Sequence, residues 1–194
     1  MAIDPRQIIT VVSGLPRSGT SLMMQLLAAA GRETLSDAKR AADEDNPLGY
    51  FEFEKTLGLA KDVSWLPQAR GKVVKIVAQL VPFLPPNEQY QVIFMQRELT
   101  EVIASQKAML ARRGVNGASI EEAELATTYT AQIERVVRHL EGRPEFRTLL
   151  VDFGELLADP VAAAERVANF VGVPFDCAAA VRSVRPELRR QKAA

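Results

Sequence analysis

Along the chain, short runs of β-branched apolar residues alternate with longer stretches in which apolar residues recur at helical spacing. The first pattern predicts strands at Ile8–Val12, Lys72–Val77, Val92–Met95 and Leu149–Val151. The second predicts helices at Ser21–Ala30, Glu54–Trp65, Glu98–Arg113, Ser119 to about Leu140, and Pro160–Val171. The polar segment from Glu33 to Pro47 is expected to be a loop with at most one helical turn. Such alternation favours an α/β fold, in which helices cover both faces of a parallel sheet.

Residues 14–21, Gly-Leu-Pro-Arg-Ser-Gly-Thr-Ser, connect the first predicted strand to the first predicted helix. The N–H groups of such a loop and of the first helical turn lack intrahelical partners, and the helix dipole adds positive charge there. Gly14 and Gly19 allow positive φ and a close approach of the backbone to an anion. The side chains that can donate further hydrogen bonds are Arg17, Ser18, Thr20 and Ser21. The segment therefore predicts a phosphate-binding loop rather than an ordinary Gly/Ser-rich turn.

The cation of this loop stands in an unusual place. In the nucleotide loop Gly-x-x-x-x-Gly-Lys-[Ser/Thr], a lysine follows the second glycine and reaches the β- and γ-phosphates. This chain has Thr20 at that position, and its cation is Arg17, inside the loop. The difference favours a ligand that places a single phosphate in the loop and has no triphosphate tail.

The loop resembles the 5′-phosphosulfate loop of sulfotransferases that use 3′-phosphoadenosine-5′-phosphosulfate (PAPS). The contacts that this resemblance implies are Leu15, Pro16, Arg17, Ser18, Gly19, Thr20 and Ser21. The family also carries an Arg at a strand end and a Ser eight residues later, which together hold the 3′-phosphate; Arg97 and Ser105 match both. A guanidinium fork and a helical hydroxyl suit an oxyanion. The alternative for Arg97 is a salt bridge with a surface acid.

A third segment, residues 149–174, resembles the family's strand, acidic turn, Leu-x-x-Asp-Pro element and following helix. Asp159 is the expected N-cap of that helix, Pro160 its first residue and Gly172 its C-terminal stop. The resemblance then covers about residues 8–175. It implies a three-layer sandwich with a central parallel sheet, the P-loop NTPase-like sulfotransferase fold, in a single domain spanning residues 1–194.

The resemblance also implies which residues act on the sulfuryl group. Arg17 is the expected catalytic cation, and Lys75 is a second candidate, because well-known members carry a lysine on such a strand. Those members place a catalytic histidine two residues after that lysine, where this chain has Val77. The one histidine, His139, lies far from every motif and is expected to be a surface or capping residue.

A carboxylate is therefore the expected general base. Residues 45–54, Asp-Asn-Pro-Leu-Gly-Tyr-Phe-Glu-Phe-Glu, resemble a segment in which several bacterial sulfotransferase-like proteins place a glutamate base. Glu52 is the candidate, with Tyr50 and Phe51 positioned to desolvate it and to line an acceptor pocket. Glu54 is a weaker candidate. In the alternative interpretation, which has equal weight, Glu52 caps a nearby helix and the two aromatic residues anchor the core.

Two departures from the family concern the adenine and the C-terminal segment. Leu22 stands where the family stacks a tryptophan on the adenine, and the sole tryptophan, Trp65, is expected in the core or in a lid. The basic tail contains Arg189, Arg190 and Lys192. It is expected either to fold back onto the 3′-phosphate or to form a basic surface helix.

Composition narrows the function further. The chain has 194 residues, of which 47% are apolar and 25% charged, as in a globular enzyme domain. Its 24 basic and 24 acidic residues give no net charge, which argues against nucleic-acid binding and weakly against a highly anionic polysaccharide acceptor. The lone Cys177 permits neither an internal disulfide nor a Cys-rich zinc site, and no metal is expected because arginines supply the positive charge. No targeting or membrane-spanning segment is visible, so a cytoplasmic location is expected.

The expected function is transfer of a sulfuryl group from PAPS to a hydroxyl or amine of a small-molecule, carbohydrate or peptide acceptor. The product is 3′-phosphoadenosine-5′-phosphate (PAP). Two alternatives remain open. A small-molecule P-loop kinase would use Asp152, after its apolar strand, to hold a metal. A non-catalytic relative would bind PAP without transferring any group. The sequence identifies neither the acceptor nor the oligomeric state.

Overall fold

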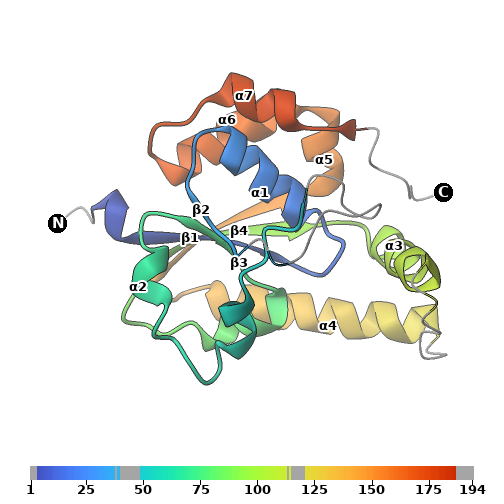
Figure 1. Ribbon diagram of the computed structural model, residues 1–194. Helices are drawn as coiled ribbons and strands as arrows, with labels where there is room; N and C mark the ends of the chain where they lie inside the picture. The colour runs from blue at the N-terminus through green and yellow to red at the C-terminus, as the bar shows by residue number, and fades with distance from the viewer. Residues whose placement is uncertain (1–3, 38, 40–48, 113, 115–120, 187–194) are drawn as a thin grey trace.

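The computed structural model describes residues 4–37, 39, 49–112, 114 and 121–186. Within them, five parallel strands form one sheet in the order β2-β3-β1-β4-β5 (Figure 1). The strands are β1 (Ile8–Gly14), β2 (Thr34–Leu35), β3 (Val73–Lys75), β4 (Gln89–Gln96) and β5 (Phe146–Asp152). The α-helices are α1 (Thr20–Ala29), α2 (Leu66–Ala69), α3 (Leu99–Arg112), α4 (Glu122–Leu140), α5 (Phe153–Ala158), α6 (Pro160–Val171) and α7 (Cys177–Ser183). The 3₁₀ helices are η1 (Pro5–Gln7), η2 (Glu54–Gly58) and η3 (Ala78–Phe83).

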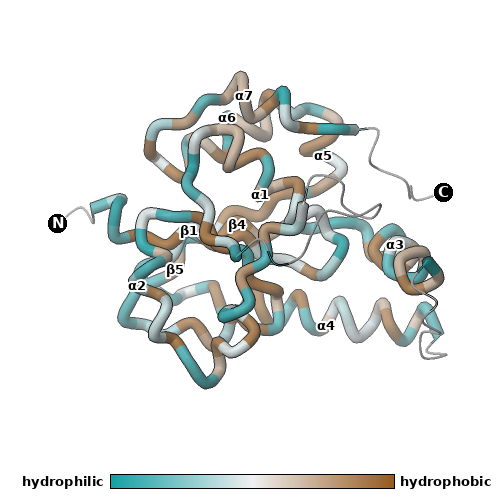
Figure 2. The backbone as a smooth tube through the Cα atoms, viewed as in Figure 1, coloured by the Kyte–Doolittle hydropathy of each residue, from teal (hydrophilic) through white to brown (hydrophobic). Residues whose placement is uncertain are grey.

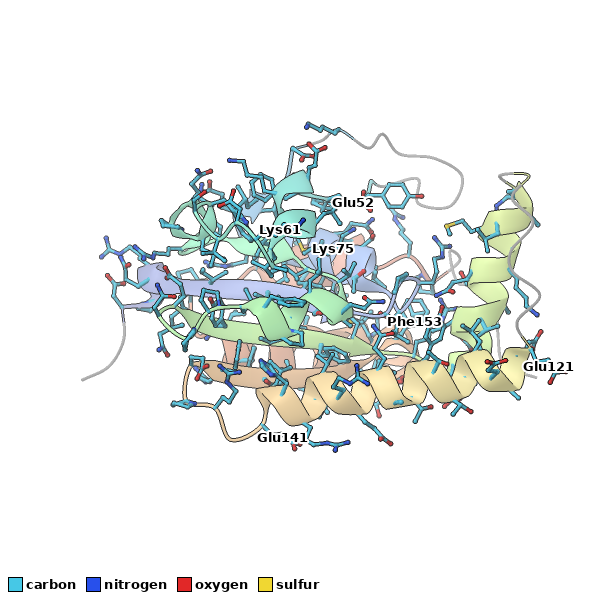
Figure 3. The ribbon with its side chains drawn as sticks, turned by 90° about the horizontal axis from the view of Figure 1, so that it is seen from below. Glu52, Lys61, Lys75, Glu121, Glu141 and Phe153 are labelled. Atoms are coloured by element: carbon cyan, nitrogen blue, oxygen red, sulfur yellow. The ribbon has the colours of Figure 1, made fainter. Side chains whose placement is uncertain are left out.

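Helices cover both faces of the sheet, so the molecule has three layers. α1, α5, α6 and α7 lie on one face, and α2, α4 and η3 lie on the other (Figure 1). The long helix α4 runs along its face between the flanking residues Glu121 and Glu141 (Figure 3). The predicted α/β fold with a central parallel sheet is confirmed.

The core consists of two apolar clusters, one on each side of the sheet. Alternate residues of β1 point to opposite faces, so that Val12 packs with Met23 and Val167, whereas Val11 packs with Trp65. Apolar stretches accordingly follow the central strands (Figure 2). A parallel sheet buried on both faces requires continuous apolar strands, which explains why the short β-branched runs were visible in the sequence.

The ends of α6 follow the predicted capping chemistry. The Asp159 carboxylate accepts a hydrogen bond from the Ala162 N–H at 3.0 Å, Pro160 is the first helical residue, and Gly172 ends the helix with φ +65°. α4 begins at Glu122, with Glu121 as its N-cap and no side-chain cap, and Ser119, where the helix was predicted to begin, lies outside the described residues.

The prediction of a helix from Glu54 to Trp65 is wrong. Only η2 forms there, and turns connect it to α2. Asp62 accepts a hydrogen bond from the Ser64 N–H at 2.8 Å, and such a local turn competes with helical bonding. Gly58, at the end of η2, further weakens helix formation.

Some short elements of the structure were not predicted from the sequence. β2 has two residues and pairs with β3 at the edge of the sheet, within the segment expected to be a loop. α5 and α7 have six and seven residues. Elements this short contain too few turns or alternations to give a periodic signal.

Candidate functional site

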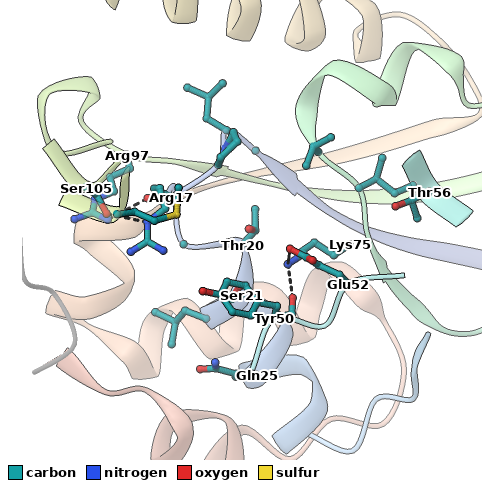
Figure 4. Close-up of a pocket in the computed structure, with 18 of the residues that line it drawn as sticks. Arg17, Thr20, Ser21, Gln25, Tyr50, Glu52, Thr56, Lys75, Arg97 and Ser105 are labelled. Atoms are coloured by element: carbon teal, nitrogen blue, oxygen red, sulfur yellow. Dashed lines mark hydrogen bonds and ion pairs between the residues drawn. The ribbon is translucent and has the colours of Figure 1, made fainter. Parts of the chain in front are cut away.

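A cavity of about 540 Å³ lies at the carboxyl ends of the strands. The register explains which residues meet there: Gly14 of β1 pairs with Met95 of β4, and Gln96 pairs with Asp152 of β5. The residues that follow these strand ends therefore lie close together beyond the carboxyl ends of the strands, which is where ligands bind in open parallel sheets. Figure 4 shows two groups of side chains there, with Thr20 and Ser21 between them. We call them the phosphate end (Arg17, Arg97 and Ser105) and the carboxylate end (Tyr50, Glu52 and Lys75).

The loop between β1 and α1 has backbone that only glycine adopts easily. Gly14 and Gly19 have φ of +148° and +99°. A Cβ on Gly14 would lie 2.7 Å from the Met95 carbonyl oxygen, and one on Gly19 would lie 2.5 Å from a ring carbon of Phe153. The N–H groups in the first turn of a helix lack intrahelical partners, and α1 has no side-chain N-cap to satisfy them. This geometry fits an anion at the helix N-terminus.

The predicted loop residues do not all face the cavity. Leu15, Pro16, Arg17, Gly19, Thr20 and Ser21 line it. Ser18 is buried beneath the loop, and its hydroxyl has no hydrogen-bond partner within the described part of the chain. Ser18 is therefore the one residue of the predicted loop contacts that does not line this cavity.

Helix α3 packs against this loop and brings two predicted residues into contact. The Arg17 Nε donates to the Ser105 hydroxyl at 2.9 Å, and the Gln106 amide donates to the Pro16 carbonyl at 3.2 Å. Arg17 has φ +74°, an unusual backbone conformation for a residue with a side chain. The loop and the serine that were predicted to bind opposite ends of one nucleotide are thus joined directly.

Arg97 follows β4, and three contacts with other described residues hold its side chain. Its Nε donates to the Glu101 carboxylate at 2.9 Å, and one Nη donates to the Arg17 carbonyl at 3.0 Å. Its guanidinium carbon lies 4.4 Å from the centre of the Phe153 ring. Glu101 and Phe153 were missed in the sequence. An acid four residues after a strand-end arginine, on the first turn of a helix, was the available signal for Glu101.

The carboxylate end is built around Lys75, the last residue of β3. Its Nζ donates to the Tyr50 carbonyl and lies 3.8 Å from Glu52 Oε1 and 5.8 Å from the centre of the Tyr50 ring. The Lys75 side chain is 9% exposed, whereas that of Glu52 is 42% exposed. The structure therefore brings the two predicted residues together at the cavity wall.

Asp37 holds the segment that carries Glu52. Its N–H donates to the Glu52 carbonyl at 3.1 Å, and its carboxylate accepts from the Glu54 N–H at 2.7 Å. The hydrogen bond from the Glu54 backbone lowers the pKa of Asp37 below its usual range. The side chain of Glu54 pairs with Lys39. Residues 45–48 of the predicted base segment lie outside the described residues.

The remaining candidates are divided between the cavity, the core and the far side of the molecule. Leu22 and Val77 line the cavity, at the positions where the resembled family has its tryptophan and histidine. Trp65 is buried and contacts Phe53 edge-on, with 5.4 Å between ring centres, so it belongs to the core. The basic tail residues Arg189, Arg190 and Lys192 lie outside the described residues.

His139 lies near the end of α4, away from the cavity lining. Its Nε2 is 2.9 Å from a guanidinium nitrogen of Arg143, and its ring contacts Phe146. Burial and the charge of Arg143 lower the pKa of His139. Asp152 caps α5, since its carboxylate accepts from the Glu155 N–H at 2.9 Å.

The comparisons with known proteins agree with the predicted resemblance. A model of the sulfotransferase family matches residues 86–177, a little under half of the chain. The sulfotransferase domain of the Synechococcus PCC 7002 olefin synthase has a similar structure, with a TM-score of 0.54 and 17% identity over 89% of this chain and 75% of that domain. The sulfotransferase domain of the curacin biosynthetic pathway gives a TM-score of 0.50 and 15% identity over 95% of this chain and 78% of that one.

A third similar structure is retinol dehydratase in complex with androsterone and the inactive cofactor PAP, with a TM-score of 0.53 and 16% identity. The match covers 94% of this chain and 64% of that protein. No curated relative matches. The resemblance to sulfotransferases is confirmed, and the chain has the sulfotransferase fold. No helix among the described residues is long and apolar enough to cross a membrane.

Proposed function

We propose that the protein transfers a sulfuryl group from PAPS to a hydroxyl or amine acceptor and releases PAP. The observation that carries the proposal is the convergence of a glycine loop, Arg97 and Ser105 at one end of a single cavity. One PAPS molecule carries two separated anionic groups, and the phosphate end offers separate donors for both. The family match and the shared fold support sulfotransfer in general.

Each donor has a proposed role in binding PAPS. Arg97 and Ser105 hold the 3′-phosphate. The N–H groups of the loop and the hydroxyls of Thr20 and Ser21, which line the cavity, hold the 5′-phosphosulfate, where the N-terminus of α1 adds positive charge. Arg17, between the two groups, neutralises charge on the oxygen that bridges phosphorus and sulfur.

The proposed reaction takes place toward the carboxylate end. Glu52 removes the proton of the acceptor hydroxyl or amine, and the acceptor atom attacks the sulfur. The bond between sulfur and the bridging oxygen breaks, and its electron pair leaves on PAP. Lys75, 3.8 Å from Glu52, orients this carboxylate and stabilises the negative charge that develops. The chain acts as one domain over residues 1–194, with no metal assigned to the reaction.

Transfer from PAPS labelled with ³⁵S tests the proposal. Panels of alcohols, phenols, amines and carbohydrates are incubated with the wild-type protein and with Glu52→Gln, and labelled products are separated. Label appearing in a product with the wild type, and at least 100-fold less with the variant, is expected. PAP binding without transfer to any acceptor would instead identify a non-catalytic relative.

The same samples test the kinase alternative. Mg·ATP labelled on the γ-phosphate replaces PAPS, and transfer of that phosphate would contradict the proposal. The expected negative result agrees with the place of Asp152, which caps α5 and is not among the residues that line the cavity.

A further inference from the structure

Other groups of the chain contact both the edge and the face of the planar Arg97 guanidinium. Glu101 binds its Nε, the Arg17 carbonyl binds one Nη, and the Phe153 ring packs against the guanidinium. The Arg97 and Glu101 side chains are 8% and 1% exposed, so this ion pair is almost completely removed from water. The cavity lining includes Arg97 and Phe153 but not Glu101.

A buried acid beside a proposed phosphate site requires an explanation. A carboxylate repels a bound phosphate, and burying an ion pair stabilises a fold little or not at all compared with apolar residues. Arginine, however, has a long side chain with many rotamers, and restricting them before a ligand arrives lowers the entropic cost of binding. Glu101 stands on the first turn of α3, where the helix dipole favours its charge.

We infer that Glu101 is a positioning residue for the 3′-phosphate site. It fixes the plane of the Arg97 guanidinium so that the fork is already oriented when the nucleotide binds. The Arg17 carbonyl completes this arrangement and joins it to the phosphate loop. The inference rests on the proposed function, since it requires that the cavity binds a nucleotide with a 3′-phosphate.

Two physical effects predict opposite results for Glu101→Gln. If the charge of Glu101 only repels the ligand, its removal tightens binding of the anionic nucleotide. If Glu101 positions Arg97, the substitution weakens binding although a negative charge has been removed. The amide keeps the size of the side chain but replaces an ion pair with a weaker neutral contact.

The experiment measures the affinities of PAP and AMP by isothermal titration calorimetry for the wild type, Glu101→Gln and Glu98→Gln. Glu98 is exposed, lies three residues earlier, and serves as a control for the loss of one negative charge. AMP lacks the 3′-phosphate and therefore reports on the loop alone. We expect Glu101→Gln to weaken PAP binding at least tenfold and to change AMP binding less than twofold, and Glu98→Gln to change neither more than twofold.

Other outcomes overturn the inference in distinguishable ways. Equal or tighter PAP binding by Glu101→Gln, or an equal loss for PAP and AMP, would refute the positioning role and leave the proposed function intact. A wild type that binds no PAP would refute both. If Glu101→Gln is unfolded at the assay temperature, Glu101→Asp replaces it, since it keeps the charge and shortens the reach. A loss of PAP affinity between two- and tenfold is then expected, and an unchanged affinity refutes the inference.

Discussion

The two ends of the cavity are built in different ways. At the phosphate end, Arg97 and the loop follow directly from central strands, and the side chains are buried or partly buried and joined to one another. At the carboxylate end, Glu52 stands on an irregular segment outside the sheet, held by Asp37 and Lys75, with 42% of its side chain exposed. In the proposed function, the sheet therefore prepares the site for the donor, whereas a peripheral segment supplies the chemistry for the acceptor. Substitutions at the two ends should therefore separate nucleotide binding from turnover.

The broadest effect, on both nucleotide binding and stability, is expected for Arg97→Ala. We expect PAP affinity to fall at least 100-fold, because the fork that meets the 3′-phosphate is lost. The free energy of unfolding should also fall by about 3–5 kcal/mol, because the buried Glu101 carboxylate loses its ion pair with Arg97. This corresponds to a decrease in Tm of roughly 6–20 °C, measured by differential scanning calorimetry.

A double variant separates the two losses. Arg97→Met with Glu101→Leu replaces the buried pair with apolar side chains of similar size, which should restore most of the Tm. PAP affinity should remain as low as in Arg97→Ala. Recovery of PAP binding in the double variant would show that Arg97 acts only through stability.

The second effect concerns the carboxylate end. Glu52→Gln should lower kcat by about 100- to 10,000-fold, the usual contribution of a general base, with PAP affinity unchanged within twofold. Glu54→Gln is the matched control, because it removes a nearby carboxylate that pairs with Lys39, and it should keep kcat within about threefold. Full activity of Glu52→Gln would eliminate this residue as the base.

A smaller loss is expected for Lys75→Met, which removes the contacts with Tyr50 and Glu52. We expect kcat to fall about tenfold while PAP, which lacks the sulfuryl group, binds as before. Lys72→Met, just before β3, removes a lysine paired with Glu33 and should leave both quantities unchanged. Steady-state kinetics and calorimetry of the two variants would contradict the assignment if they gave equal results.

The smallest effect lies outside the cavity, at His139. Its folded-state pKa is lowered, so between the unfolded value near 6.5 and the lower folded value the unfolded chain binds more protons. The wild type should therefore lose stability as pH falls through this window, and His139→Gln should lose less. Urea unfolding between pH 7 and 5 measures this difference. Sulfuryl transfer should be unchanged by the substitution, and its loss would return His139 to the list of candidate bases.

The contrast between the two ends also explains what the sequence could predict. Residues 14–21 lie between a strand and a helix that have strong local patterns, so the phosphate-binding loop between them was predicted. Arg97 and Ser105 were identified through the family resemblance, whose residue types and spacing they match. Phe153 and the Arg17 carbonyl, in contrast, reach Arg97 only through strand register and loop conformation, which a single sequence does not specify. The segment around Glu52 lacks periodicity, and Asp37, which holds it by hydrogen bonds, lies in a region predicted as loop. The contact between these two segments could therefore not be predicted from the sequence.

The most direct test is a crystal structure of the protein with PAP. The account predicts the 3′-phosphate within hydrogen-bond distance of Arg97 and Ser105, the 5′-phosphate over the first turn of α1, and Glu52 facing the 5′-phosphate from across the cavity. PAP bound in the reverse orientation, or with its 3′-phosphate against Lys75, would contradict the assignment of the two ends.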